Sequence, residues 1–189
     1  MTPQATFCAA CLIASTSSVS STFSPTSRPP VSKARGRFTK WGGQIRFDPD
    51  DAAASSLEVT IDPSSIDTAD AQRDAHLRSA DFFDVEKFPT ASFRSTKVEG
   101  LPGDRYRIVG NLTIHGVTKT VVLDATYEGS GKDPWGGERA GFVAGTSIDR
   151  KDFGLAWNQA LETGGLLVGE KVELTLEIEA VKQAAQKVA

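Results

Sequence analysis

The stretch Val172-Glu173-Leu174-Thr175-Leu176-Glu177-Ile178-Glu179-Ala180-Val181 decides the fold class. Its apolar residues at 172, 174, 176, 178 and 180 alternate with polar residues. A repeat of two is the repeat of a β-strand, whose successive side chains point to opposite faces of a sheet. One face of this strand must therefore meet apolar material, and the other must meet water.

Six further segments read as strands separated by turn residues. They are 36–47, 57–61, 91–98, 105–112, 117–127 and 141–148. Helical spacing is confined to 68–79, which allows three turns at most. Strands this close together, with no helix between most of them, cannot form parallel crossovers. The sequence therefore predicts a largely antiparallel all-β sandwich or barrel with one short helix.

Composition limits the class of protein further. The chain has 189 residues, 39% of them hydrophobic and 24% charged, which suits one globular domain. Its net charge of −3 and pI near 5.4 argue against a non-specific nucleic-acid binder. No run approaches the roughly 18 to 20 apolar residues of a transmembrane helix.

The N-terminal region differs from the rest of the chain. Residues 1–31 are rich in Ser, Thr and Pro, which predicts a disordered tail. A domain over 32–181 follows, and 182–189 form a C-terminal tail. The apolar run 6–14 is short and no Lys or Arg precedes it, so a secretory signal is disfavoured and a cytoplasmic location is expected.

Both cysteines lie in that tail, as Cys8 and Cys11. Their C-x-x-C spacing is that of redox and metal sites, but no second pair of ligands accompanies it. We interpret them as incidental thiols and expect neither a metal nor a cofactor.

Candidates for catalysis are few. His76 could act as a general base, with Asp81 and Asp84 nearby in sequence, but a polar residue on the surface of the short helix is the favoured interpretation. Asp81 and Asp84 flank two phenylalanines, which favours a helix cap with two buried aromatic rings. His115 precedes a glycine and suits a hairpin tip. The glycine-rich run 164–169 leads into a strand, so it reads as a turn and not as a phosphate loop.

Several motifs, taken in order along the chain, resemble the YceI-like family over residues 32–181. Along the chain they are Ile61-Asp62 with Ser65 to Thr68, Arg73 to Phe93 (RDAHLRSADFFDVEKFPTASF), Gly110 to Thr118 (GNLTIHGVT), Arg150 to Asn158 (RKDFGLAWN), and Leu161 to Gly165 with Val168-Gly169. The resemblance implies a lipocalin-like antiparallel barrel of about eight strands. It implies a bacterial protein that binds a long-chain polyisoprenoid or isoprenoid quinone for carriage or storage, with no established catalysis.

A barrel of this size is about the smallest that can hold a ligand. The expected cavity wall consists of apolar residues that share a strand face: Leu57, Val59, Ile61, Phe93, Ile108, Leu112, Leu123, Phe142, Leu174, Leu176 and Ile178. Trp135 and Trp157 are expected at the cavity mouth, where an amphipathic ring suits a polar head group. Two alternatives stay open: a barrel filled by its own side chains, serving in stress response or protein interaction, and an enzyme that uses His76 and nearby carboxylates.

The N-terminus departs from the family pattern. Members usually open with a complete first strand, whereas this chain has Pro29-Pro30 shortly before the resemblance begins, and consecutive prolines make a poor strand. We hypothesise that the first strand is missing, through a shifted reading frame or a misplaced start. Seven strands would then leave two unpaired edges, which favours pairing between copies, including a homodimer.

Overall fold

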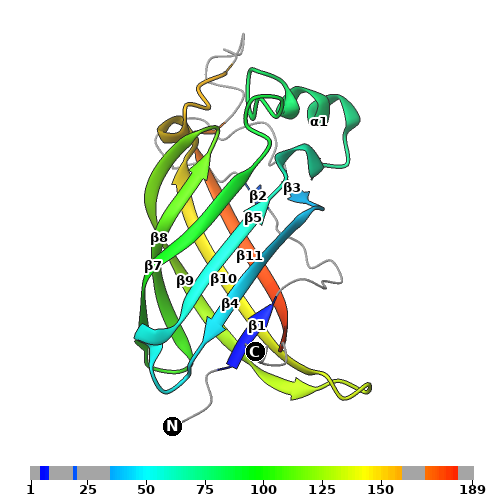
Figure 1. Ribbon diagram of the computed structural model, residues 1–189. Helices are drawn as coiled ribbons and strands as arrows, with labels where there is room; N and C mark the ends of the chain where they lie inside the picture. The colour runs from blue at the N-terminus through cyan, green and yellow to red at the C-terminus, as the bar shows by residue number, and fades with distance from the viewer. Residues whose placement is uncertain (1–4, 9–18, 21–34, 159–168, 183–189) are drawn as a thin grey trace, which may run out of the picture.

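The computed structural model describes residues 5–8, 19–20, 35–158 and 169–182. In these ranges, seven long antiparallel strands wrap into an elongated and nearly closed barrel (Figure 1). The strands are β4 (Trp41–Phe47), β5 (Ser56–Ile61), β7 (Ala91–Leu101), β8 (Arg105–Ile114), β9 (Val117–Lys132), β10 (Glu138–Asp149) and β11 (Lys171–Lys182). The predicted antiparallel barrel is thereby confirmed.

Each long strand pairs antiparallel with the long strand before it, so strands that are neighbours in the sequence are also neighbours in the barrel wall. The β8–β9 connection has two residues, His115 and Gly116, with φ of 50° and 72°. Two positive φ values in a two-residue loop match the twist of the flanking strands. The predicted hairpin tip at His115 is confirmed.

Several strands extend beyond their predicted bounds, and two further differences change how the chain is divided into strands. The segment 36–47 is two strands, β3 (Arg35–Phe38) and β4, because the chain changes partners between them: β3 pairs with β6 (Ile66–Asp67), whereas β4 pairs with β5. The glycine-rich residues 128–137 predict a turn, and the structure forms one over 133–137. Residues 128–132 instead continue β9, because β10 pairs with them from Glu138 onward.

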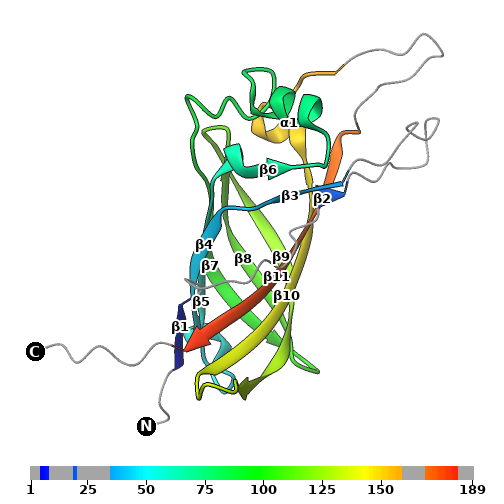
Figure 2. The same cartoon turned by 90° about the vertical axis from the view of Figure 1, so that its right-hand side faces the viewer.

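Two short strands lie in the region expected to be a disordered tail. β1 (Ala5–Cys8) pairs with β4 on one side and with β11 on the other, near the lower end of the barrel (Figure 2). β2 (Val19–Ser20) pairs with β11 and β3. The expectation that no strand precedes residue 31, leaving both edges wholly unpaired, is wrong at these positions. The rest of 1–31, Cys11 included, lies outside the described residues, as do 183–189.

A helical segment lies over the upper end of the barrel. Helix α1 (Ala71–Arg78) begins at Asp70, whose carboxylate accepts hydrogen bonds from the backbone N–H groups of Gln72 and Arg73, both at 3.1 Å. Such a cap satisfies N–H groups that have no partner within the helix. The prediction of a short helix within 68–79 is confirmed. Short 3-10 turns occupy Ala52–Ala54 (η1), Pro63–Ser65 (η2) and Arg150–Phe153 (η3).

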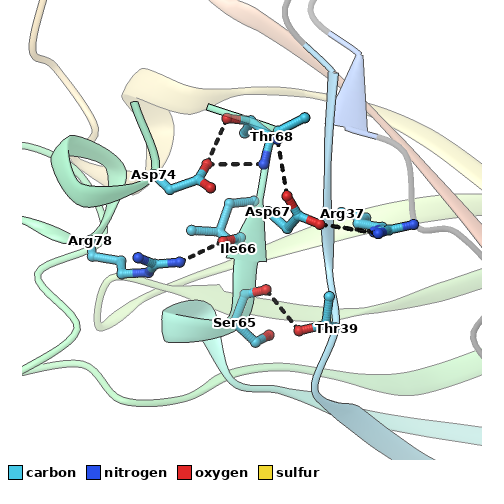
Figure 3. A network of polar contacts seen from close by, with 9 residues as sticks. Arg37, Thr39, Ser65, Ile66, Asp67, Thr68, Asp74 and Arg78 are labelled. Carbon is cyan, nitrogen blue, oxygen red and sulfur yellow. Dashed lines mark hydrogen bonds and ion pairs between the residues drawn. The ribbon is translucent and has the colours of Figure 1, made fainter. Parts of the chain in front are cut away.

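A polar network attaches α1 to the barrel (Figure 3). Asp74 of α1 is buried and accepts hydrogen bonds from the backbone N–H of Thr68, at 2.9 Å, and from its hydroxyl, at 2.6 Å. Arg78, at the end of the helix, donates to the carbonyl oxygens of Ser64 and Ile66, both at 2.7 Å. The helix is therefore held against η2, β6 and the residue that follows β6 by side chains from its middle and its C-terminal end.

The same network continues to β3. Asp67 of β6 pairs with Arg37 at 3.1 Å, and the hydroxyl of Thr39 donates to the carbonyl of Ser65 at 3.1 Å (Figure 3). Because α1 is tied to β6 and β6 is tied to β3, these elements form one connected cover over the upper end. Within the described residues, no helix is long and apolar enough to cross a membrane.

Candidate functional site

The eleven residues predicted to line a cavity all belong to one apolar cluster. Six of them are buried: Leu57, Val59, Phe93, Leu112, Leu123 and Ile178. The other five are partly buried and pack against these: Ile61, Ile108, Phe142, Leu174 and Leu176. The structure thus brings the whole set together, as expected from strand alternation. Their role as a ligand-binding wall stays a prediction.

Small residues occupy several positions of this cluster. Ala125 of β9 and Ala144 of β10 are register partners, and both are buried members of the cluster. Ala91, Ala140 and Ala180 are buried members too. Side chains that end at Cβ fill little of a barrel interior, which at about eight strands is just wide enough to be filled by larger ones. The alanines therefore fill less of the barrel interior than larger apolar side chains would at the same positions.

Gly110 of β8 shows how one large ring is accommodated. A Cβ atom at this position would lie 2.4 Å from the ring of Phe93 and 2.6 Å from the carbonyl oxygen of Arg94. The glycine thus allows the ring of Phe93 to lie directly over the neighbouring strand. The sequence suggested a family motif here but not this contact, because the ring comes from another strand.

Aromatic side chains fill the lower end of the barrel. The ring of Phe47 lies 5.4 Å from that of Tyr106, 4.9 Å from that of Tyr127 and 5.2 Å from that of Phe142. Edge-to-face and tilted arrangements at such distances are favourable for aromatic rings. Burial, with a smaller contribution from Asp104, raises the pKa of Tyr106 above its ordinary value. These four residues form one aromatic cluster at the lower end of the barrel, called the aromatic plug below.

The upper end is more polar. The ring of Trp157 lies 4.5 Å from the imidazole of His76 and 5.3 Å from the ring of Phe82. His76 Nε2 lies 3.2 Å from Asp81 Oδ2, and the His76 side chain is 37% exposed. Trp157 is half-buried. Trp157 therefore lies beside the cover, at one end of the apolar interior. Its role at a cavity mouth stays a prediction.

Arg150, which sequence reasoning did not single out as a site residue, is buried at the same end. It is 3% exposed, and its Nε donates to the carbonyl oxygen of Gly169 at 2.8 Å. Its Nη1 donates to the carbonyl oxygens of Leu155 and Trp157. Burial lowers the pKa of the Arg150 guanidinium, against the raising effect of Glu170 and Asp149. The sequence did hold a signal for its burial. The even-numbered residues Ala144 and Ile148 of β10 are buried, and continuing this alternation by two residues predicts an inward side chain at Arg150.

Trp135 does not share this end of the barrel. It lies in the connection between β9 and β10, at the opposite end from α1, and is 86% exposed. A surface groove near it contains the charged residues Asp133, Arg139 and Glu179, in which Arg139 forms ion pairs with both carboxylates. The expectation that both tryptophans lie at one cavity mouth is therefore wrong for Trp135.

The candidate acid–base residues are only partly brought together. His76 and Asp81 pair, but Asp84 pairs with Lys87 at 3.1 Å instead. The expected helix cap at Asp81 or Asp84 is wrong, because α1 is capped by Asp70 and ends at Ser79. Of the two aromatic rings between them, Phe82 is buried and Phe83 is half-buried.

The remaining candidates have structural surroundings or fall outside the described residues. The ring of His115 packs 4.5 Å from that of Phe88. Cys8 lies in β1 and pairs in register with Gln44 and Val181. In the glycine-rich run, only Gly169 is described, and its carbonyl oxygen binds Arg150.

Fold and interior together define an antiparallel barrel with an apolar interior, one aromatic end and one covered polar end. The sequence model of the YceI-like domain matches residues 12–180. The chain therefore belongs to the YceI-like family. The match begins at residue 12, so it extends further towards the N-terminus than the motifs from residue 32 indicated.

Known relatives come from bacteria. A UPF0312 protein of Vibrio cholerae is 47% identical over 121 residues, which are 64% of this chain and 64% of the relative. The match thus spans less than two thirds of that relative. A UPF0312 protein of Pseudomonas aeruginosa is 45% identical over 148 residues, covering 78% of this chain and 74% of the relative.

Solved structures share the fold. The Campylobacter jejuni YCEI protein is 33% identical with a TM-score of 0.72, over 85% of this chain and 92% of that one. Burkholderia cenocepacia BcnA is 27% identical with a TM-score of 0.70, over 87% and 96%. A polyisoprenoid-binding domain from Saccharophagus degradans, implicated in plant cell wall breakdown, has a TM-score of 0.60 at 17% identity, over 94% of both chains. This last likeness concerns the fold alone.

Proposed function

We propose that this protein binds a long-chain polyisoprenoid lipid or isoprenoid quinone inside the barrel, for carriage or storage. The observation that carries the proposal is the continuous apolar cluster formed by the inward faces of the seven long strands. Among the described residues, the buried charged side chains are those of Asp74 and Arg150, and both belong to the upper end of the barrel. A surface of this kind suits a hydrocarbon chain, because transferring apolar area from water is favourable and requires no specific hydrogen bonds.

The accessible surface of one inward-facing side chain supports the same proposal. Ile108 lies in the middle of β8 and is the register partner of Leu123, a buried member of the cluster. Cross-strand partners project from the same face of a sheet, so Ile108 projects into the barrel with Leu123. Ile108 nevertheless keeps accessible surface. We infer that this surface borders space that side chains of the barrel do not fill.

The two ends of the barrel give such a ligand a direction. The aromatic plug places apolar rings at the lower end, whereas His76, Trp157 and Arg150 gather polar groups near the upper end. A lipid with one polar head and a long apolar tail fits with its tail towards Phe47 and its head under α1. The name of the Saccharophagus degradans domain agrees with a ligand of this class.

The test is mass spectrometry of an organic extract from the protein purified without detergent. Apolar ligands in a closed cavity dissociate slowly and survive purification, since affinity differences are carried mostly by the off-rate. We expect about one isoprenoid lipid per chain. An empty extract, together with failure to take up an added polyprenol, would instead favour a barrel filled by its own side chains.

An enzyme remains the competing interpretation of the His76–Asp81 pair. It predicts turnover that is lost in His76→Ala, whereas a carrier predicts that this variant still loads lipid. The extract from His76→Ala, compared with the wild-type extract, separates the two interpretations.

A further inference from the structure

Arg150 has more hydrogen-bonding capacity than the surrounding chain uses. A guanidinium has five N–H donors. In Arg150, Nε and Nη1 donate to three backbone carbonyl oxygens, those of Gly169, Leu155 and Trp157. Its Nη2 is buried and has no hydrogen-bond partner within the described part of the chain. The three carbonyl bonds explain why an arginine is useful for holding this loop, but they leave the Nη2 group unexplained.

The guanidinium of Arg150 also has no ion pair within the described part of the chain. Among the described residues, no carboxylate lies within ion-pair distance of its guanidinium, although both adjoining surface carboxylates, Asp149 and Glu170, are close enough to influence it. Arginine stays charged in proteins, and a buried charge is costly unless it is paired. A buried guanidinium with free donors therefore suits an anionic oxygen as partner.

The position of Arg150 relates it to the lipid proposed above. Residues on either side of it in sequence, Ile148, Phe153 and Leu155, are buried members of the apolar cluster. One of its carbonyl partners belongs to Trp157, whose ring contacts His76 of the cover. Arg150 thus lies where the apolar interior meets the polar upper end, which is where the head of a lipid would lie if its tail filled the barrel.

We propose that Arg150 binds the head group of the lipid through Nη2, and that this head group is anionic, of the phosphate class. The inference rests on the proposed function and adds the chemistry of the head. Arginine pairs well with phosphate, because its planar donors match the phosphate oxygens. Nη2 is covered by protein in this structure, so binding requires the atoms that cover it to move aside.

The test is a competition between two lipids of equal chain length. The wild-type protein is offered equal amounts of a polyprenyl phosphate and the corresponding polyprenol, and the bound lipids are extracted and quantified. A hydrogen bond to a charged group predicts that the phosphate is bound at least about tenfold more than the alcohol. In Arg150→Met, the ratio should fall to about one, while total polyprenol binding persists.

Arg78→Met is the matched control. Arg78 also donates to backbone carbonyl oxygens, those of Ser64 and Ile66, so its loss weakens the cover without removing the free Nη2 group. This variant should keep the preference for the phosphate. Equal loss of preference in both variants would assign the effect to the cover and overturn the role of Arg150.

The other outcomes are separate. Equal binding of phosphate and alcohol by the wild-type protein refutes the anionic head group, even if Arg150→Met fails to fold. Uptake of neither lipid contradicts the proposed function itself. A wild-type protein that is stabilised by inorganic phosphate alone, without preferring the lipid phosphate, would show that the site takes a free anion, and would overturn the assignment to a lipid head.

Discussion

Replacing Ala144 with leucine distinguishes an interior with free space from one that is already filled. Ala144 is 5% exposed and pairs in register with Ala125, which is 7% exposed, on the inner side of the β9–β10 wall. The substitution adds three carbon atoms inside the barrel. In free space these atoms would bury new apolar surface, contributing at most about 2.4 kcal/mol, at about 0.8 kcal/mol per buried methylene. In a filled core the same atoms would overpack it and cost about 1–3 kcal/mol.

The assay is urea denaturation of the lipid-free protein, with the lipid content of the purified variant measured in parallel. We expect Ala144→Leu to leave the free energy of unfolding unchanged or raised, and to lower the amount of bound isoprenoid because the tail loses space. Val143→Leu is the control on the same strand, since Val143 is 36% exposed and faces outward. It should change stability by no more than about 0.5 kcal/mol and leave lipid content unaltered. A loss of more than about 1 kcal/mol in Ala144→Leu, with lipid content unaffected, would refute the reasoning.

Three further predictions concern packing, the cover and pH. Gly110→Ala should destabilise the fold by about 1–3 kcal/mol, because its Cβ would meet the ring of Phe93; Gly42→Ala, whose Cβ would meet nothing within 4 Å, is the control in the same denaturation experiment. Asp74→Ala should lower the free energy of unfolding by about 1–3 kcal/mol, because the two donors of Thr68 lose their acceptor, and should speed amide hydrogen exchange in α1 more than in β8. An equal increase in exchange in α1 and β8 would contradict a local attachment of the helix. The side-chain hydrogen bond from Arg139 lowers the pKa of Asp133, so the folded state binds this proton less readily than the unfolded state does. The ionised Asp133 therefore stabilises the fold above the ordinary pKa near 3.8, and this stabilisation is lost as the pH falls through the lower pKa of the folded state. The melting temperatures of wild type and Asp133→Asn should converge on acidification below about pH 4.

Strand alternation and turn residues were sufficient to predict most of the barrel. β5 and β11 alternate so regularly that one face had to be buried, and the structure buries Leu57, Val59 and Ile178 there. The glycine-rich end of β9 was misread because its backbone is held by pairing with β10, a long-range contact that local composition does not reveal. β1 was missed for a similar reason: its partners, Gln44 and Val181, lie far away in the sequence.

The candidate site was predictable to a similar extent. The apolar cluster followed from strand alternation, whereas the place of Trp157 at a cavity mouth stays a prediction made from its amphipathic ring. Arg150 was not identified as a site residue, because an arginine beside two charged neighbours looks exposed in sequence. Its burial depends on carbonyl oxygens of Leu155, Trp157 and Gly169, which only the folded loop brings together. Trp135 was misplaced because an aromatic residue in a glycine-rich turn indicates exposure but not the end of the barrel at which it lies.

The position of β1 has a consequence for how the chain folds. β1 joins β4 to β11, so Phe7 pairs with Ile45 and also with Lys182, at the far end of the last strand. The hairpins from β7 to β11 form from neighbours in sequence, but this closure brings together segments from opposite ends of the sequence. Such contacts carry a large loop-closure entropy and form slowly. β1 precedes both of its partners in the chain, so during synthesis it leaves the ribosome before they do. Until β11 has emerged, the unpaired edge of β1 is available to chaperones or to other copies.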